Sequence, residues 1–155
     1  MRRALIILGL GAACLLLGAA DKAGKANIAD LLAGRFHWTA GAPLVEAANS
    51  SADQYYSVKD PSVVYYRGRW HLFCTVRGKA RSHQIEYLSF RDWRDADKGR
   101  RQMLTITDGY FCAPEVFYFA PHKKWYLIYQ ALDKSRQPAL QPAWSTATDI
   151  ADHGS

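Results

Sequence analysis

The feature of this sequence that most restricts its fold is an internal repeat of two strand-forming segments. The first copy, residues 61–66 and 70–76, reads Pro-Ser-Val-Val-Tyr-Tyr and, after a turn, Trp-His-Leu-Phe-Cys-Thr-Val. The second copy, residues 114–119 and 125–128, reads Pro-Glu-Val-Phe-Tyr-Phe and then Trp-Tyr-Leu-Ile. The offset of about fifty residues lies in the range of propeller blades. Repeated small antiparallel sheets predict a β-propeller, and two unrelated hairpins of a β-sandwich are the alternative.

Each copy is predicted to form a hairpin followed by a further strand. Residues 63–66 and 70–76 are rich in β-branched and aromatic residues, and Arg67-Gly68-Arg69 between them predicts a three-residue turn. A third strand is expected at residues 84–89, and the unit closes at Asp92. In the second copy a strand at 143–146 corresponds to residues 87–90, and Asp149 corresponds to Asp92. The chain is therefore predicted to be all-β and to carry about the first two blades of a propeller.

Closure of a propeller requires at least four blades. We therefore expect residues 36–155 to be a truncated part of a propeller domain, with further blades in the complete protein. Two blades by themselves leave open strand edges and an unfinished core, so we expect this chain alone to be inactive.

The N-terminus has the pattern of a secretory signal. Two arginines precede an uncharged run over residues 4–17, and the small residues Gly18-Ala19-Ala20 follow. The run is shorter than the roughly 20 residues that cross a bilayer, so we expect cleavage and no stable membrane insertion. Residues 1–20 are therefore predicted to be a signal peptide of a secreted or periplasmic protein. Residues 21–35 are a lead-in segment that is either helical or a mobile connection.

Charge and cysteine content exclude some functions and leave one question open. The formal net charge is +6, but the basic residues are scattered through turns, which argues against nucleic-acid binding. Two cysteines follow the signal, Cys74 and Cys112, and they either pair in an oxidising compartment or stay as buried free thiols. His71 is expected in the core, and no Cys or His spacing forms a zinc site.

Lys59-Asp60-Pro61 is the first candidate for chemistry. The motif stands directly before the first strand of the first copy, and the innermost strand of a propeller blade lines the central channel. Pro61 biases Asp60 toward an extended conformation, which would hold the carboxylate at the mouth of the channel. An Asp before a Pro is also an ordinary turn residue, so the motif alone does not decide between the two.

Residues 36–150 resemble glycoside hydrolase family 62 and, more loosely, family 43. The blocks that carry the resemblance are residues 36–39, 58–66 with Gly68, Trp70 and His71, 87–93, 113–121, 124–130, 143–146 and 148–150. They follow one another in order over nearly the whole chain after the signal.

The resemblance implies a five-bladed propeller that removes α-L-arabinofuranosyl side chains from arabinoxylan or arabinan with inversion. It assigns the general base to Asp60, and it leaves the general acid and the residue that tunes it beyond the end of the chain. Inversion requires two carboxyl groups roughly 6.5–9.5 Å apart, so that a water fits beside the sugar. No cofactor is required, although the channel of such a propeller can hold a structural calcium. The alternative is a propeller that binds carbohydrate without cleaving it.

Substrate contacts are expected from Lys59, Phe111 and Glu115. Aromatic residues expected in loops near the pocket, where exposed rings stack on sugars, are Tyr55, Tyr56, Tyr110 and Phe111. Residues 110–115 and the long loop at 134–142 depart from the usual pattern of family 62. Because these segments meet the sugar in that family, the exact polysaccharide is left open.

Overall fold

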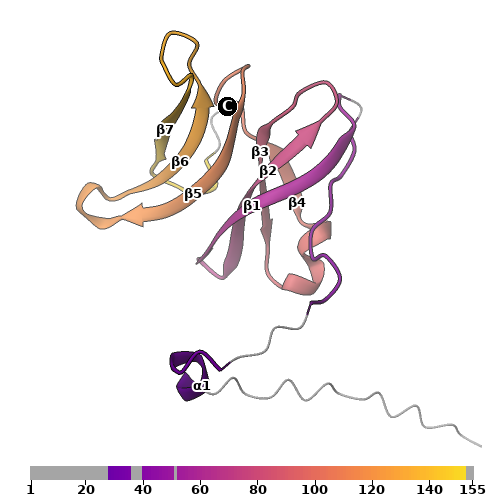
Figure 1. Cartoon of the computed structure of the whole chain (residues 1–155). Helices are drawn as coiled ribbons and strands as arrows, with labels where there is room; N and C mark the ends of the chain where they lie inside the picture. Colours follow the sequence, from indigo (N-terminus) through magenta and orange to yellow (C-terminus); the bar gives the residue numbers. More distant parts are fainter. Residues whose placement is uncertain (1–27, 36–39, 51, 153–155) are drawn as a thin grey trace, which may run out of the picture. The chain divides into compact units, whose positions relative to one another are not determined.

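The computed structural model describes residues 28–35, 40–50 and 52–152, which fall into two units, residues 1–40 and 41–155. In the first unit the short helix α1 (Ile28–Leu32) has no buried residue (Figure 1). It lies where the spacing of Ile28, Leu31 and Leu32 predicts helicity. The signal peptide predicted for residues 1–20 lies outside the described residues, so it stays a prediction. No helix among the described residues is long and apolar enough to span a membrane.

The second unit contains two antiparallel sheets, as the sequence predicts (Figure 1). The first sheet has the order β1–β2–β3–β4, with β1 at Tyr55–Tyr66, β2 at Arg69–Gly78, β3 at Gln84–Phe90 and β4 at Arg100–Met103. The second has the order β5–β6–β7, with β5 at Phe111–Phe119, β6 at Lys124–Leu132 and β7 at Leu140–Ala147. The all-β prediction is therefore confirmed.

The first hairpin turn is tighter than predicted. Arg69 already pairs with Tyr66, so only Arg67 and Gly68 form the loop, with φ angles of 49° and 75°. Two successive residues with positive φ make the turn whose twist matches that of the flanking strands. The second hairpin uses the 3₁₀ turn η2 (Ala120–His122), which ends at Lys123 with φ 51°.

The two sheets repeat the same irregular strand pairing. Lys59 opposes Thr75 and Ser62 opposes Phe73, so three steps along β1 match two along β2. In the second sheet Cys112 opposes Gln130 and Glu115 opposes Ile128, which is the same pattern. Each first strand therefore carries a β-bulge of one extra residue at the same place. The repeat is confirmed, and it makes Asp60 equivalent to Ala113.

The bulge corrects two predictions about Asp60. The motif lies inside β1, not before it, because β1 begins at Tyr55. Asp60 has φ 52° rather than the extended conformation that Pro61 favours, and Ala113 before Pro114 has φ 53°. The bulge in the pairing overrides the preference of a residue that precedes proline.

The chain between β3 and β5 contains two elements that the sequence did not predict. Residues 93–98 form the 3₁₀ helix η1 (Trp93–Lys98), and β4 then pairs with β3. The correspondence of Asp92 with Asp149 is supported by matching turns. Asp92 Oδ1 accepts a hydrogen bond from the amide of Arg94 at 2.9 Å, and Asp149 Oδ1 accepts one from the amide of Ala151 at 3.0 Å.

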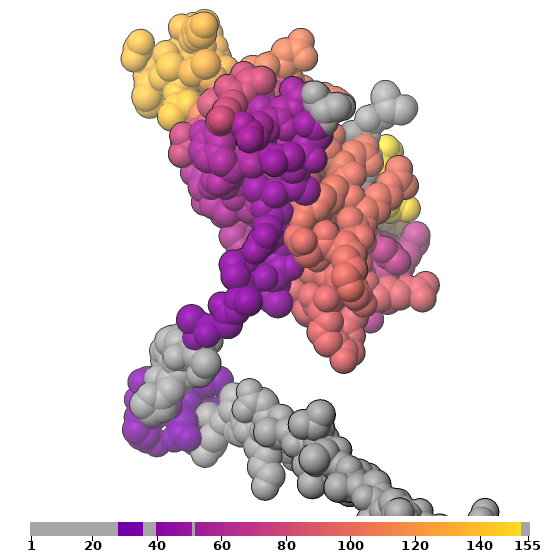
Figure 2. All heavy atoms as spheres, turned by 90° about the vertical axis from the view of Figure 1, so that its right-hand side faces the viewer, coloured from indigo at the N-terminus to yellow at the C-terminus, as the bar shows by residue number. Residues whose placement is uncertain are grey.

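Two apolar clusters cover the two faces of the first sheet. The cluster shared with the second sheet contains Phe73, Ile85, Tyr87, Leu104, Phe111, Val116, Trp125, Tyr129 and Ile150. On the opposite face, Leu72, Cys74, Leu88, Phe90 and Ala96 pack with Val45, Trp70 and Trp93. β1 and β2 of this sheet contact β5. Figure 2 shows the segment before β1, in purple, lying against the coral atoms of η1, where the amide of Glu46 donates a hydrogen bond to Asp97 Oδ1 at 2.9 Å. His71 is buried in this sheet, as predicted, between the Tyr87 hydroxyl at 2.8 Å and the Tyr66 carbonyl at 3.3 Å.

In the part of the chain that the structure describes, the second sheet is covered on one face. Its other face has a hollow of about 450 Å³, lined by Phe117, Phe119, His122, Tyr126, Ile128, Pro142, Ala143 and Trp144. Trp144 is 66% exposed there. Within the described residues, nothing packs over this apolar surface in the way that the second sheet packs over the first.

The cysteine question is settled in favour of free thiols. Cys74 and Cys112 are both buried and unpaired. Burial raises the pKa of the Cys74 thiol to about 12, which makes it an unreactive core side chain.

Candidate active site

Asp60 lies in the bulge of the first strand, where the extra residue turns its side chain out of the regular strand alternation. Aspartate tolerates a left-handed conformation better than most residues, so it suits this position. Its side chain is 39% exposed, and Lys59 Nζ lies 3.7 Å from Asp60 Oδ2. The carboxylate is therefore held beside a cation and remains open to a ligand.

Arg77 and His83 lie in the same neighbourhood as the Lys59–Asp60 pair, and the sequence reading missed both. Burial lowers the pKa of His83, Lys59 and Arg77 lower it further, and the charge of Asp60 opposes them. Lys59, Arg77 and Asp60 therefore all lie close enough to His83 to act on its charge. Arg77 also places its guanidinium carbon 5.4 Å from the centre of the Tyr56 ring. No recognised motif marks these residues, so only the fold brings them to Asp60.

Tyr110 continues this group toward the second sheet. Its ring centroid lies 4.5 Å from that of His83, and its hydroxyl lies 3.3 Å from Cys112 Sγ. The hydrogen bond with Cys112, together with burial, raises the pKa of Tyr110 to about 12. The phenol therefore stays protonated, with its ring beside His83.

The structure corrects the prediction for Phe111 and places Glu115. Phe111 is not an exposed loop ring: it opens β5, is fully buried, and packs edge-on against Tyr129 at 6.2 Å. The guanidinium of Arg81 covers it at 5.1 Å, so the ring has no free face for a sugar. Glu115 is exposed on β5, three residues after Cys112. Tyr55 and Tyr56, also expected in a loop, belong to β1.

Two buried hydroxyl groups of the first sheet, one on β1 and one on β2, bind the first strand of the second sheet. Ser62 Oγ accepts a hydrogen bond from the amide of Val116 at 2.9 Å. Thr75 Oγ1 accepts one from the amide of Ala113 at 2.8 Å. The sequence reading gave neither residue a role, although Ser62 directly follows the Lys59-Asp60-Pro61 motif. These bonds hold β1 and β2 against β5 near both bulges.

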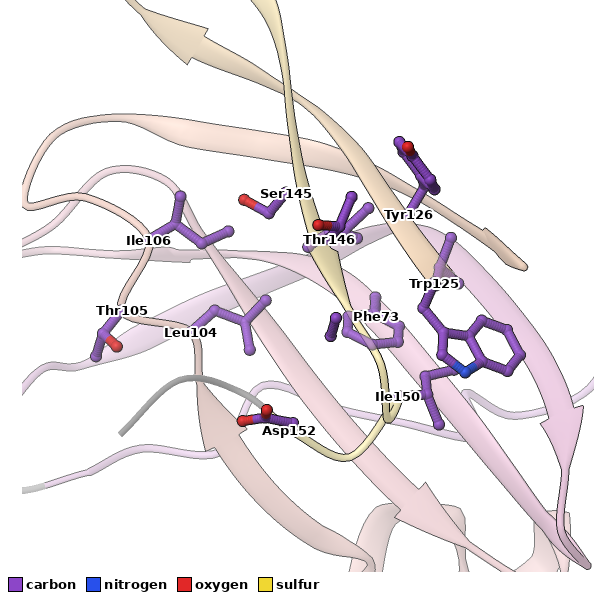
Figure 3. A pocket seen from close by; sticks show the side chains of 13 residues that line it. Phe73, Leu104, Thr105, Ile106, Trp125, Tyr126, Ser145, Thr146, Ile150 and Asp152 are labelled. Atoms are coloured by element: carbon purple, nitrogen blue, oxygen red, sulfur yellow. The ribbon is translucent and has the colours of Figure 1, made fainter. Parts of the chain in front are cut away.

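A cavity of about 330 Å³ lies between the two sheets, away from the predicted site (Figure 3). Its labelled lining includes Phe73, Leu104, Ile106, Trp125 and Ile150, whose side chains converge from both sheets and from the segment before β5. None of Lys59, Asp60 and Glu115 lines it. The lining is mostly apolar and includes a single carboxylate, Asp152, so the cavity does not offer the paired carboxylates that the predicted reaction requires.

The carboxylates near Asp60 differ in what they can do. Glu86 is 3% exposed and receives Arg101 Nη1 at 3.0 Å, so it serves the first sheet and not a ligand. Asp60 is accessible and can accept a proton from a water.

Among the residues that the structure describes, no group of three or more His, Cys, Asp or Glu side chains can hold a metal ion. The calcium suggested for the channel stays a prediction.

Two antiparallel sheets that repeat one strand-pairing pattern, each with a bulge in its first strand, have the arrangement of a propeller-like β-protein. Comparison with known families makes the assignment specific. The model of glycosyl hydrolase family 62 matches residues 37–151, and the chain belongs to that family.

The relatives agree with this assignment. α-L-Arabinofuranosidase C of Cellvibrio japonicus is 39% identical over 94 residues, which cover 60% of this chain and 14% of that protein. The catalytic domain of a Coprinopsis cinerea family 62 α-L-arabinofuranosidase is 37% identical with a TM-score of 0.60, over 70% of this chain and 32% of that one.

Two further solved structures contain bound oligosaccharides. A family 62 hydrolase in complex with xylotriose is 32% identical with a TM-score of 0.61, over 72% of this chain and 32% of that one. A Podospora anserina α-L-arabinofuranosidase in complex with cellotriose is 34% identical with a TM-score of 0.59, over 70% and 32%. The chain thus spans about a third of the length of the solved relatives.

Proposed function

We propose that this chain is the part of an inverting α-L-arabinofuranosidase that supplies the general base, Asp60. The observation that carries the proposal is the position of Asp60: an accessible carboxylate in the first bulge of a family 62 chain, with Lys59 beside it. In the proposed reaction Asp60 takes a proton from a water as that water attacks the anomeric carbon. A carboxylic acid from another part of the protein protonates the departing oxygen.

Lys59 and Glu115 are proposed to contact the substrate. The ammonium of Lys59 lies beside the carboxylate and can donate hydrogen bonds to sugar hydroxyls. Glu115 is exposed on the first strand of the second sheet and can accept them. Phe111 is left out of this set because it is buried under Arg81.

The exposed face of the second sheet supports a propeller that continues beyond two blades. Phe117, Phe119, Ile128 and Trp144 occupy the positions that Val64, Tyr66, Phe73 and Tyr87 occupy in the first sheet. Those first-sheet residues pack against the second sheet. We propose that a third sheet packs on the second in the same way, within a five-bladed propeller.

The proposed substrate is a plant cell-wall polysaccharide, arabinoxylan or arabinan. The xylotriose and cellotriose in the related structures support binding of a β-linked backbone. The pattern of residues 1–20 supports export, so we propose a secreted or periplasmic enzyme that meets its polymer outside the cytoplasm.

The decisive experiment compares the complete protein that contains these residues with its Asp60→Asn variant, in arabinose release from arabinoxylan. General-base catalysis contributes roughly 10²–10⁴-fold, and we expect kcat to fall by about that factor. Asp95→Asn is the matched control, because Asp95 is an exposed carboxylate of η1 that forms an exposed ion pair with Lys98. Equal rates for Asp60→Asn and the unaltered protein would overturn the assignment of the base.

The alternative is a carbohydrate-binding propeller without catalysis. It predicts no arabinose release by the complete protein and undiminished retention on insoluble arabinoxylan. Product analysis of the complete protein separates the two, because an inverting enzyme releases the β-anomer first.

A further inference from the structure

The hydroxyl groups of Ser62 and Thr75, in the interface between the two sheets, each form a hydrogen bond with the backbone of the other sheet. Thr75 is fully buried and Ser62 is 7% exposed. Each accepts a hydrogen bond from a backbone amide of the other sheet, at 2.8 Å from Ala113 and at 2.9 Å from Val116. Both bonds therefore run from a side chain of the first sheet to the main chain of β5.

The two hydroxyls lie at the two ends of the bulge that carries Asp60. Thr75 opposes Lys59, the last paired residue before the bulge, and Ser62 is the first paired residue after it. The irregular stretch of β1 is thus fixed at both ends. Asp60 and Pro61 are the two residues of β1 that lie between these fixed points.

One of the bound amides belongs to the equivalent bulge of the second sheet, and the other follows that bulge. Ala113 is the bulge residue of β5, and Val116 follows Glu115, the first residue paired after it. Ala113 has φ 53°, a conformation that is unfavourable for alanine, so its amide needs a partner that holds it there. The Thr75 hydroxyl is that partner, and the two bulges are locked to each other.

We propose that Ser62 and Thr75 are positioning residues that set the place of the Asp60 carboxylate relative to the first strand of the second sheet. The proposal rests on the proposed function, in which Asp60 is the general base. A base acts only when its oxygen lies within hydrogen-bond reach of the attacking water, and a displacement of about 1 Å can cost 10²-fold in rate.

Thr75→Val in the complete protein is the main test. Valine keeps the shape of threonine but accepts no hydrogen bond, so the Ala113 amide loses its partner. We expect kcat to fall by about 10- to 100-fold with KM unchanged, because a displaced Asp60 affects proton transfer from the attacking water in the transition state and not the binding of the substrate. Thr75→Ser keeps the hydroxyl and should restore most of kcat. Ser62→Ala should lower kcat in the same way.

A control separates positioning from a general loss of stability. Ser145 Oγ lies 3.1 Å from the Tyr129 hydroxyl inside the second sheet, and Ser145 itself belongs to β7, which pairs regularly with β6 and not with β5. Ser145→Ala removes a side-chain hydrogen bond without touching β1. We expect it to keep kcat and KM, with each rate normalised to the folded fraction measured by thermal unfolding.

The outcomes distinguish this inference from the function on which it rests. If Asp60→Asn abolishes activity while Thr75→Val keeps normal kcat, the positioning role is wrong and the base stands. If Thr75→Ser is as slow as Thr75→Val, the methyl group and not the hydroxyl matters, which also overturns the inference. If Asp60→Asn itself is fully active, the proposed function fails first.

Discussion

The two sheets share one pairing pattern but differ in what surrounds it. Phe73 and Ile128 oppose the residues that close the two bulges, yet Phe73 is 4% exposed and Ile128 is 39% exposed. Tyr87 and Trp144 are the partners of these two residues on the next strand, at 5% and 66% exposure. The first sheet has the second sheet against this face, whereas nothing among the described residues covers the same face of the second. Burial in a repeat is therefore decided by the neighbouring sheet and not by the strand's own residues.

The largest expected effect comes from truncating these equivalent core positions. Phe73→Ala should lower the free energy of unfolding of this chain by about 3–5 kcal/mol, the usual result of removing a buried aromatic ring. Ile128→Ala should lower it by less than about 1 kcal/mol, because its side chain already contacts water. Urea denaturation of both variants measures the difference.

The same pair of variants sharpens the comparison in the complete protein. If a third sheet covers Ile128 there, Ile128→Ala should cost about 2–5 kcal/mol, as for other buried isoleucines. A cost that stays below about 1 kcal/mol in both proteins would contradict a third sheet on this face.

The second prediction concerns a charge that only the first sheet carries. Glu86 opposes Cys74 in the first sheet, and Ala143 holds the equivalent place opposite Tyr129. Arg101 of β4 neutralises Glu86 at 3.0 Å, with side-chain exposures of 16% and 4%. Arg101→Met would leave the carboxylate buried without a partner. We expect a loss of about 3 kcal/mol at neutral pH, near the lower end for such pairs because Arg101 is partly exposed.

The pH dependence of the Arg101→Met variant identifies the cause of its loss. Burial raises the pKa of Glu86, and Arg101 opposes that shift. Without Arg101 the folded state favours protonated Glu86 more strongly, so the penalty should shrink as the pH falls toward the folded pKa. A penalty that is the same at acidic and neutral pH would contradict this account. Arg94→Met, which breaks the exposed pair with Asp92, is the control and should change stability little.

The third prediction uses His71, whose place in the second sheet is taken by Tyr126. Burial lowers the pKa of His71, with Arg69 in the same direction and the Tyr66 carbonyl and Asp149 opposing. Because the folded pKa lies below the unfolded value of 6.5, the folded state binds fewer protons. Stability is then complete above pH 6.5 and is lost as the pH falls through the folded pKa.

One titrating group changes stability by at most about 1.4 kcal/mol per pH unit. Urea midpoints of the unaltered chain should therefore decline below pH 6.5, and His71→Gln should decline less over the same range. Equal slopes for the two proteins would show that His71 is not the group responsible.

Much of the fold could be predicted from the sequence, because the repeat itself encodes it. The shared Pro, Val and Trp positions gave both hairpins, and Asp92 and Asp149 gave matching turns. The bulges could not be predicted. Pro61 and Pro114 favour extended residues before them, and the pairing with β2 and β6 overrides that local preference. The short strand β4 was missed because its charged residues lack a strand pattern, and its role depends on Glu86 of β3.

The candidate site also contains residues that the sequence could predict and residues that only the fold brings together. Asp60 and Lys59 stand in one motif, so the sequence places them together. Arg77 and His83 lie on β2 and on the segment before β3, and no local pattern connects them with Asp60. Phe111 was expected to be exposed because aromatic residues near a pocket often are. Its burial follows from the second sheet packing on the first, which no single strand encodes.

The smallest expected effect concerns the two hairpin turns. The first turn has glycine at its second left-handed position, Gly68 with φ 75°, and alanine there should destabilise the chain. The second turn has Lys123 with φ 51°, where a side chain is strained. Lys123→Gly should stabilise the chain by about 0.5–1 kcal/mol, since glycine adopts this conformation without the steric cost but loses more entropy on folding. Urea denaturation tests both changes, and a destabilising Lys123→Gly would mean that contacts of the lysine outweigh the strain of its backbone.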